Sequence, residues 1–312
     1  MTSENLKAHT FGWIGTGKMG YPMAERLIAA GVDVTVYNRT AAKAEPLGVT
    51  VVGAPSDLAD RDIVYTIVTD DTAFLETVLG PNGVLSGETT PKILIDSSTV
   101  SPEASDKVRA AAAAKGVQFL ATPISGNGNA VKAGKASLGV SGPRDAYDIV
   151  EPYLEQLGRG VSYLGEGDLA RLAKLAHNVM LGVVAQCLAE ITVFCEKGGI
   201  ERHAFLDYLN KSAMGSIFST YKVPALVHLD FTATHTSKML RKDMELALTA
   251  ARDLEVPMPI ANMTRDIIQS LIGNGHGDSD FAALIELQAK ASGYDIQPEN
   301  VEVSDGLQAA AE

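Results

Sequence analysis

The 312-residue sequence predicts an α/β fold, in which a doubly wound, mainly parallel sheet is followed by an all-α C-terminal domain that begins with a long helix. Two observations predict it. Short apolar runs alternate with helical patterns as far as about residue 165, as in consecutive βαβ units. After the Gly-Glu-Gly of residues 165–167 the pattern is helical throughout. We therefore expect two domains, residues 1–166 and residues 167–312, with the joining helix and a C-terminal tail in the second.

The first strand, Phe11–Gly15, leads into a turn with the sequence Gly-Thr-Gly-Lys-Met-Gly and then into the helical run Tyr21–Ala30. Gly15 permits the tight turn, Gly17 lets a pyrophosphate approach the backbone, and Gly20 allows close helix–strand packing. The helix N-terminus offers N–H groups to the phosphates. This context predicts a Rossmann-type dinucleotide-binding domain rather than an ordinary glycine-rich turn. We assign the whole turn to the cofactor: Gly15, Thr16, Gly17, Lys18, Met19 and Gly20.

The second strand, Val34–Tyr37, ends where the adenosine ribose of a dinucleotide is normally bound. An Asp or Glu there would bind the two ribose hydroxyls of NAD. Instead the chain has Arg39, with Lys43 one turn later, which suits a 2′-phosphate and favours NADP (NADPH), with NAD still possible. The alternative is an arginine solvated in a loop. The residues assigned to this end of the cofactor are Asn38, Arg39, Thr40 and Lys43.

Further strands and helices continue the alternation. The expected strands are Val49–Val52, Ile63–Val68, Lys92–Asp96, Val117–Ala121, Ala136–Val140 and Val161–Gly165, and the helices between them are Asp71–Leu79, Pro102–Lys115 and Pro143–Leu157. Ligand-facing loops follow the strand C-termini in a doubly wound sheet, which assigns Val68 and Thr69 to the cofactor. Two other loops stand out. Asp96–Pro102 concentrates hydroxyl groups, and Thr122–Asn129 offers small residues whose backbone N–H groups could hold a carboxylate.

The joining helix is expected over Asp168–Lys197, about 30 residues without proline and roughly 45 Å long. Apolar residues on nearly every side predict burial by protein on most faces, while its polar residues argue against a membrane span. Lys174, His177 and Asn178 fall on one face. Such a lysine is a candidate for proton transfer, the alternative being a lysine that extends to solvent. The later helices are expected over Glu201–Ala213, Ser237–Leu254, Ile260–Ile272 and Asp280–Lys290, followed by a loosely held tail, Glu299–Glu312.

Composition narrows the class of protein. The 46% hydrophobic and 21% charged content is typical of a globular chain with a large core. The net charge of −12 argues against nucleic acid and anionic membrane as partners. The polar N-terminal sequence has no signal-peptide core, so we expect a cytoplasmic protein. Cys187 and Cys195 lie about 12 Å apart on one helix and are expected to be reduced core residues. The six histidines lack metal-ligand spacing, so no metal site is expected.

Several motifs follow one another along the chain. They are Gly15–Ala24 (GTGKMGYPMA), Asp96–Pro102 (DSSTVSP), Pro123–Gly126 (PISG), Lys174–Asn178 (KLAHN), Lys242–Ala247 (KDMELA) and Asp280–Ala283 (DFAA). In this order they resemble the β-hydroxyacid dehydrogenase family over about residues 11–290. That family includes 3-hydroxyisobutyrate dehydrogenase, tartronate semialdehyde reductase, 6-phosphogluconate dehydrogenase and glyoxylate/succinic semialdehyde reductases.

The resemblance implies an oxidoreductase that interconverts a small β-hydroxy acid and its semialdehyde or keto acid by hydride transfer, and Arg39 with Lys43 favours NADP as its cofactor. It also implies a C-terminal domain like that of 6-phosphogluconate dehydrogenase. Lys174 would be the general acid/base, and Asn178 would orient the substrate or the lysine. Thr99 and Lys242 would contact the cofactor near the nicotinamide. The residues assigned to a carboxylate-bearing substrate are Ser125, Gly126, Asn127, Thr99 and His177, of which Asn127 and His177 depart from the family's pattern.

Two other functions stay open. One is an imine reductase of the same architecture, although such relatives usually have Asp or Tyr at the lysine position. The other is a non-catalytic dinucleotide-binding interaction protein, since some relatives have lost the lysine. Lys174 together with Asn178 disfavours both. We also expect a homodimer or homotetramer, because a helical domain of about 130 residues built along one apolar helix needs a partner surface to cover its outer faces.

Overall fold

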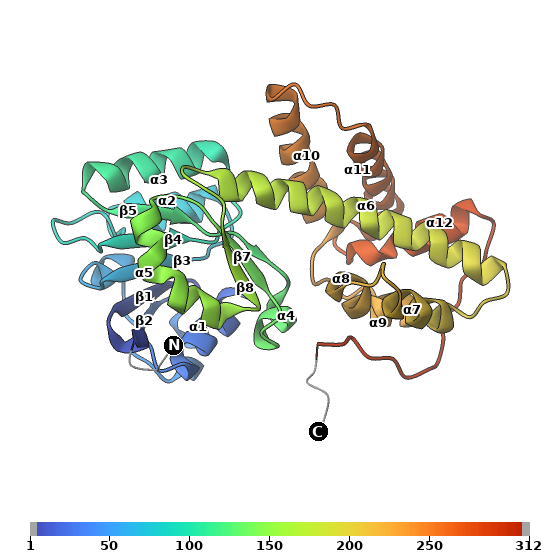
Figure 1. Ribbon diagram of the computed structural model, residues 1–312, viewed down its shortest axis with the longest axis horizontal. Coiled ribbons are helices and arrows are strands. Elements are labelled where there is room, and N and C mark those ends of the chain that lie inside the picture. Colours follow the sequence, from blue (N-terminus) through green and yellow to red (C-terminus); the bar gives the residue numbers. More distant parts are fainter. Residues whose placement is uncertain (1–4, 308–312) are drawn as a thin grey trace. The chain divides into compact units, whose positions relative to one another are not determined.

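The computed structural model describes residues 5–307, and the chain divides into two compact units, residues 1–174 and 175–312 (Figure 1). The division falls inside one long helix, α6 (Leu169–Lys197), which begins in the first unit and continues through the second. The boundary expected from the sequence, between residues 166 and 167, lies just before this helix.

A five-stranded parallel sheet forms the centre of the first unit and confirms the predicted fold class. Its strands are β1 (Thr10–Ile14), β2 (Asp33–Tyr37), β3 (Ile63–Thr66), β4 (Ile93–Asp96) and β5 (Gln118–Ala121), in the order β2-β1-β3-β4-β5. The connection after β1 leads to β2 on one side, whereas the connection after β3 leads to β4 on the other, so the two connections diverge between β1 and β3. That point is where ligands of such sheets bind.

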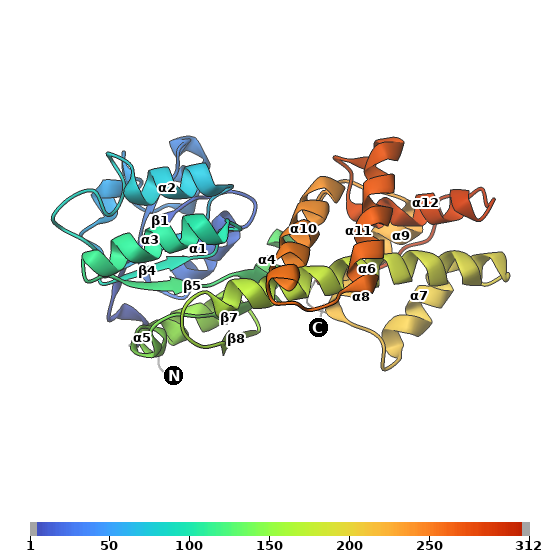
Figure 2. The same ribbon diagram turned by 90° about the horizontal axis from the view of Figure 1, so that it is seen from above.

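Helices cover both faces of this sheet (Figures 1 and 2). They are α1 (Gly20–Ala29) and α5 (Arg144–Leu154) on one face, and α2 (Asp71–Leu79) and α3 (Pro102–Ala114) on the other. Phe11 and Trp13 of β1 belong to the first core, whereas Ile14 belongs to the second, as the alternation of side chains along a strand requires. Trp13 stacks on Tyr65 of β3, with ring centroids 4.3 Å apart. Buried strands of this kind explain the near-continuous apolar runs in the sequence.

Three expected strands differ in the structure, and those expected at residues 136–140 and 161–165 both lie outside the main sheet. Residues 136–140 contribute β7 (Ser137–Val140) to a separate three-stranded sheet, between β6 (Ile124–Ser125) and β8 (Gly160–Tyr163). The short helix α4 (Gly128–Lys132) lies between β6 and β7 in sequence. Residues 49–52 make one bridge, from Val51 to Val36, instead of a strand. Glycines, which weaken strands, flank that segment at positions 48 and 53.

The second unit is helical, as predicted, and no strand occurs within residues 175–307. Besides α6 it contains α7 (Arg202–Lys211), α8 (Ile217–Tyr221), α9 (Val223–His228), α10 (Ser237–Asp253), α11 (Pro259–Leu271) and α12 (Leu284–Ala291). Helices α10 and α11 pack side by side (Figures 1 and 2). The core includes Val179 and Ala189 of α6, Met244 of α10, Ile268 of α11 and Leu284 of α12.

A buried ion pair joins two segments of the second unit. The Lys222 amino group lies 2.5 Å from Asp280 Oδ1 and 4.4 Å from the centroid of the Phe281 ring. Burial alone would raise the pKa of Asp280, but the charge of Lys222 and the hydrogen bonds that the carboxylate accepts hold that pKa below its ordinary value. Asp280 therefore has a structural role, since its carboxylate also accepts hydrogen bonds from the backbone N–H and hydroxyl of Thr234.

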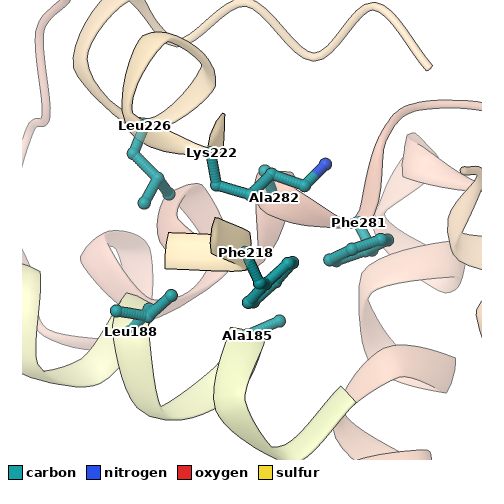
Figure 3. A pocket seen from close by; sticks show the side chains of 7 residues that line it. All are labelled: Ala185, Leu188, Phe218, Lys222, Leu226, Phe281 and Ala282. Carbon is teal, nitrogen blue, oxygen red and sulfur yellow. The ribbon is translucent and has the colours of Figure 1, made fainter. Parts of the chain in front are cut away.

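A small pocket lies beside this pair (Figure 3). It is lined by Ala185, Leu188, Phe218, Lys222, Leu226, Phe281 and Ala282. The space is about 10 Å³, room for about one water molecule. Figure 3 shows the Lys222 side chain running past Ala282 toward Phe281. The pocket is too small to bind a substrate.

One face of α6 is apolar and exposed, contrary to the expectation that this helix is buried on most sides. Met180 is 68% exposed and Phe194 77% exposed. Cys187 is also exposed and Cys195 half-buried, so the expectation of two core cysteines was wrong for Cys187; both are free thiols. By length and composition α6 could cross a membrane, and half of its most apolar stretch is buried within the fold.

The chain end is more firmly held than the sequence suggested. Glu299 accepts hydrogen bonds from the backbone N–H groups of Arg202 and His203, at 2.7 and 3.0 Å, at the start of α7. Arg202 is fully buried, and Leu307 is 7% exposed. Residues 299–307 of the expected loose tail therefore dock on the second unit, whereas residues 308–312 lie outside the described part of the chain.

Candidate functional site

The glycine-rich turn lies between β1 and α1, at the C-terminal end of β1. Gly15 has a φ of +101°, and a Cβ there would lie 2.1 Å from the Ile67 carbonyl oxygen. A Cβ on Gly20 would lie 2.1 Å from the Gly15 oxygen, whereas one on Gly17 would meet no described atom within 4 Å. Among described residues, no side chain caps α1 at Met19. The open surface at Gly17 and the first amides of α1 therefore fit a pyrophosphate.

The loop after β2 is tied to this turn by Asn38. Its Oδ1 accepts a hydrogen bond from the Thr16 N–H at 2.9 Å, and its Nδ2 donates to the Thr40 carbonyl at 2.8 Å. Arg39, Thr40 and Lys43 are exposed. Of the residues predicted at the ribose end, Asn38 thus positions the loop, and the other three present their side chains to solvent.

Arg39 also lies within electrostatic reach of the loop after β3. The hydrogen bond from the Ala73 N–H is the main cause that lowers the pKa of Asp70, and the charge of Arg39 adds to it. Asp70 caps α2 through that same bond. A phosphate bound at Arg39 would therefore lie near a carboxylate, which opposes its binding.

A buried carboxylate fixes the loops after β3 and β4. Asp96 is fully buried, and its Oδ1 accepts hydrogen bonds from the hydroxyls of Thr66 and Ser98, each at 2.6 Å. Its Oδ2 accepts one from Arg171 of α6 at 2.6 Å, and Arg171 also donates to the Ser98 carbonyl at 2.7 Å. The Val68 N–H donates to the Ser98 hydroxyl at 2.9 Å. One network therefore connects two loops at the ligand edge of the sheet with the start of α6.

This network contains or adjoins three residues that were predicted to bind the cofactor. Val68 is part of it, Thr69 follows Val68, and exposed Thr99 follows Ser98. Arg171 lies one helical turn before Lys174. No role was predicted for Asp96 or Arg171, although an aspartate at the end of a strand, followed by serines, was a usable signal for Asp96.

The loop predicted to hold a carboxylate lies at β6. Ser125 ends that strand, and Gly126 has a φ of +124°, with its Cβ position 3.1 Å from the Ala130 Cβ. The Oδ1 of Asn127 accepts a hydrogen bond from the Ala130 N–H at 2.9 Å and caps α4. The predicted substrate residue Asn127 therefore has its carboxamide oxygen committed to the helix.

Lys174 is half-buried on α6 and is the last residue of the first unit. One turn later, in the second unit, buried Asn178 donates from Nδ2 to Asp243 Oδ2 at 2.9 Å. The Nδ1 of His177 lies 3.0 Å from Asn178 Oδ1. Lys242 is half exposed, with Nζ 3.7 Å from Asp243 Oδ1. The structure thus places two predicted residues, Asn178 and Lys242, against the carboxylate of Asp243, with His177 beside Asn178. No role was predicted for Asp243.

Taken within each unit, the arrangement suits two tasks. The first unit presents backbone amides and exposed cations at the edge of a parallel sheet, which can hold the phosphates of a dinucleotide. The second unit holds a buried amide, Asn178, anchored to Asp243, which can orient a bound group for reaction. Within the described residues, no group of three or more His, Cys, Asp or Glu side chains could hold a metal ion.

Comparison with known protein families matches both units. Residues 10–165 match the NAD-binding domain of 6-phosphogluconate dehydrogenase. Residues 168–288 match the NAD-binding domain of NADP-dependent 3-hydroxyisobutyrate dehydrogenase.

Individual proteins that are similar to this chain agree with the family matches. The chain is 31% identical to glyoxylate/succinic semialdehyde reductase 1 of Arabidopsis thaliana, over 88% of this chain and 96% of that protein. It is 34% identical to the uncharacterized oxidoreductase YfjR of Bacillus subtilis, over 88% of this chain and 97% of that protein. A solved structure of Mycobacterium tuberculosis 3-hydroxyisobutyrate dehydrogenase with L-serine superposes with a TM-score of 0.75 at 25% identity, covering 89% of this chain and 98% of that one.

Proposed function

The chain belongs to the β-hydroxyacid dehydrogenase family of NAD(P)-dependent oxidoreductases, and from this premise we propose an NADP-dependent enzyme that interconverts a small β-hydroxy acid and its semialdehyde. The observation that carries the proposal is the face of α6 on which Lys174 precedes the buried, anchored Asn178 by one turn. The bound nicotinamide supplies or accepts the hydride.

Lys174 is the general acid/base of the proposed reaction. In reduction it gives a proton to the carbonyl oxygen on which negative charge develops, and in oxidation it takes the proton from the hydroxyl. Asn178, which Asp243 holds by a hydrogen bond of 2.9 Å, orients the substrate or the lysine. A positioned proton donor of this kind contributes about 10²–10⁴-fold in rate.

The cofactor residues of the proposal lie mainly in the first unit. The turn from Gly15 to Gly20, including Lys18 and Met19, would hold the pyrophosphate through backbone N–H groups. Arg39 and Lys43 would bind the 2′-phosphate. The residues that would lie near the nicotinamide end are Val68, Thr69, Thr99 and Lys242.

The substrate of the proposal carries a carboxylate. Ser125 and Gly126 would bind it through backbone N–H groups, with Thr99, Asn127 and His177 completing the site. Two relatives support this class: the Arabidopsis protein is named for glyoxylate and succinic semialdehyde, and the mycobacterial structure contains L-serine, a β-hydroxy acid.

We expect the enzyme to prefer acids over neutral aldehydes by about 10²-fold in kcat/KM, because a bound carboxylate orients the carbonyl for reaction. NADPH oxidation should be followed with malonate and succinate semialdehydes, propanal and butanal. The methyl ester of succinate semialdehyde is the matched control, since it keeps the chain and removes the charge. Equal turnover of acid and ester would contradict carboxylate binding. Tight NADPH binding without turnover of any compound would instead support a non-catalytic binding protein.

We further propose that α6 mediates a homodimer or homotetramer. Met180, Cys187 and Phe194 are exposed and seven residues apart, so they lie along one face of the helix. A contiguous apolar face of this kind marks an interaction site, and a second copy can cover it symmetrically. Partners other than a second copy, such as a membrane or nucleic acid, are disfavoured by the net charge of −12. The cytoplasmic location stays a prediction.

Glu substitutions on this face should separate the subunits. The double variant Met180→Glu/Phe194→Glu buries two carboxylates in the proposed interface, which is unfavourable, so light scattering at micromolar concentration should change from an oligomer to a monomer. Tyr208→Glu is the control, because Tyr208 is 70% exposed but lies on α7. A monomeric wild-type protein, or a double variant that keeps the wild-type mass, would refute the proposal.

A further inference from the structure

Asp243 lies in the middle of α10 with its side chain 4% exposed. Three groups face its carboxylate. Asn178 Nδ2 of α6 donates to Oδ2 at 2.9 Å, His235 Nε2 lies 3.4 Å from Oδ2, and Lys242 Nζ lies 3.7 Å from Oδ1. The amino group of Lys242 lies near this buried carboxylate and offsets its charge. The shortest of the three contacts, however, is the hydrogen bond from the neutral amide of Asn178.

The chemistry of these groups decides which way the amide points. An ionised carboxylate can only accept hydrogen bonds, so Asn178 must turn its NH₂ toward Asp243. Its carbonyl oxygen Oδ1 then faces the other way, where it lies 3.0 Å from His177 Nδ1. A carboxamide oxygen also only accepts, so His177 Nδ1 must carry the hydrogen. In the neutral ring, Nε2 then holds the lone pair.

We propose that Asp243 is a positioning residue that fixes the carboxamide orientation of Asn178 and, through it, the tautomer of His177. A hydrogen bond to a charged group favours one amide orientation by roughly 10–100-fold over the reverse. His177 and Asn178 follow Lys174 on the same helix, within about one turn. By orienting the Asn178 amide, Asp243 therefore sets which atoms of Asn178 and His177 accept hydrogen bonds beside Lys174. For its effect on rate the inference rests on the proposed function, whereas the tautomer assignment does not.

The direct test is ¹⁵N NMR of protein labelled in histidine. At about pH 8.5, above the ordinary histidine pKa of about 6.5, two-bond couplings distinguish Nδ1–H from Nε2–H rings. His177→Gln identifies the signal. We expect the Nδ1–H form in the wild type and a mixture, or the Nε2–H form, in Asp243→Asn, because an amide at position 243 can face Asn178 in either orientation. An Nε2–H ring in the wild type, or an unchanged ring in Asp243→Asn, would overturn the proposal.

His235→Gln is the matched control. It removes the ring that lies 3.4 Å from Oδ2 but leaves the carboxylate and its bond to Asn178, so the Nδ1–H form of His177 should persist. Loss of that form in His235→Gln as well would show that the tautomer depends on local packing rather than on Asp243.

Kinetics measure the consequence for the reaction. Asp243→Asn should lower kcat by about 10–100-fold, typical of removing a group that orients a reacting residue, with little change in NADPH affinity or melting temperature. Asp243→Glu, which keeps the carboxylate, should recover part of the loss. A changed tautomer in a protein that turns over no acid would leave this inference standing and refute the proposed function. An active enzyme whose Asp243→Asn variant keeps its kcat would refute the inference alone.

Discussion

Lys174→Ala is expected to lower kcat by about 10²–10⁴-fold, because the variant cannot give a proton to the oxygen that becomes negative during hydride transfer. NADPH affinity should stay near the wild-type value, since the residues that fit the pyrophosphate and ribose lie at the glycine turn and the loop after β2. Steady-state kinetics on the preferred semialdehyde, together with NADPH fluorescence titration, would measure both quantities.

Two further variants separate the possible roles of this lysine. Lys174→Arg keeps the positive charge but cannot release its proton, so its kcat should stay low if proton transfer is the role. Lys197→Ala removes a lysine from the other end of the same helix, about 35 Å away, and should leave kcat unchanged. Activity of Lys174→Ala within tenfold of wild type would exclude the assigned role, and a fully active Lys174→Arg would assign it to charge alone.

The sequence predicted the elements whose signals are local. The helix α2 occurs at the predicted residues, Asp71–Leu79, because Asp70 caps its start and Gly80 follows its end. The missed segments β6, α4, α8 and α9 are two, five, five and six residues long, too short for a period of apolar residues to be visible. The exposed face of α6 was missed for a different reason, since composition alone does not show which apolar residues a second surface covers.

In the candidate site, too, the features with a local sequence signal could be predicted, and those that depend on distant residues could not. The glycine turn could be predicted because the positive φ of Gly15 and the close approach of backbone atoms to Gly15 and Gly20 require glycine at these neighbouring positions. Asp243 and Arg171 could not, because their roles depend on partners 65 and 75 residues away, Asn178 and Asp96. The predicted role of Asn127 was incomplete, because a residue that caps a helix and a residue that binds a ligand look alike in sequence.

The choice of cofactor depends on Arg39, which is exposed at the end of β2 where no Asp or Glu is present to bind ribose hydroxyls. Arg39→Ala is expected to weaken NADPH binding and to leave NADH binding nearly unchanged, because only NADPH has the 2′-phosphate. Each charge-assisted hydrogen bond contributes about 1.5–3 kcal/mol, so Arg39 and Lys43 together give roughly 10²–10⁴-fold preference for NADPH. Solvent exposure should bring the value toward the lower figure.

The neighbourhood of Arg39 supplies a sharper control. Asp70 lies close enough for the two charges to interact, so its carboxylate opposes a phosphate at Arg39. Asp70→Asn keeps the cap of α2, because asparagine caps helices as well as aspartate does, and removes the opposing charge. This variant should bind NADPH more tightly than wild type, and Arg39→Ala less tightly.

The preference for NADPH over NADH should shrink in salt, where the Debye length falls from about 10 Å at 0.1 M to about 3 Å at 1 M. The measurement is kcat/KM for both cofactors in all three proteins. Equal values for NADPH and NADH in the wild type, or an Arg39→Ala variant that loses both equally, would show that Arg39 does not bind the 2′-phosphate.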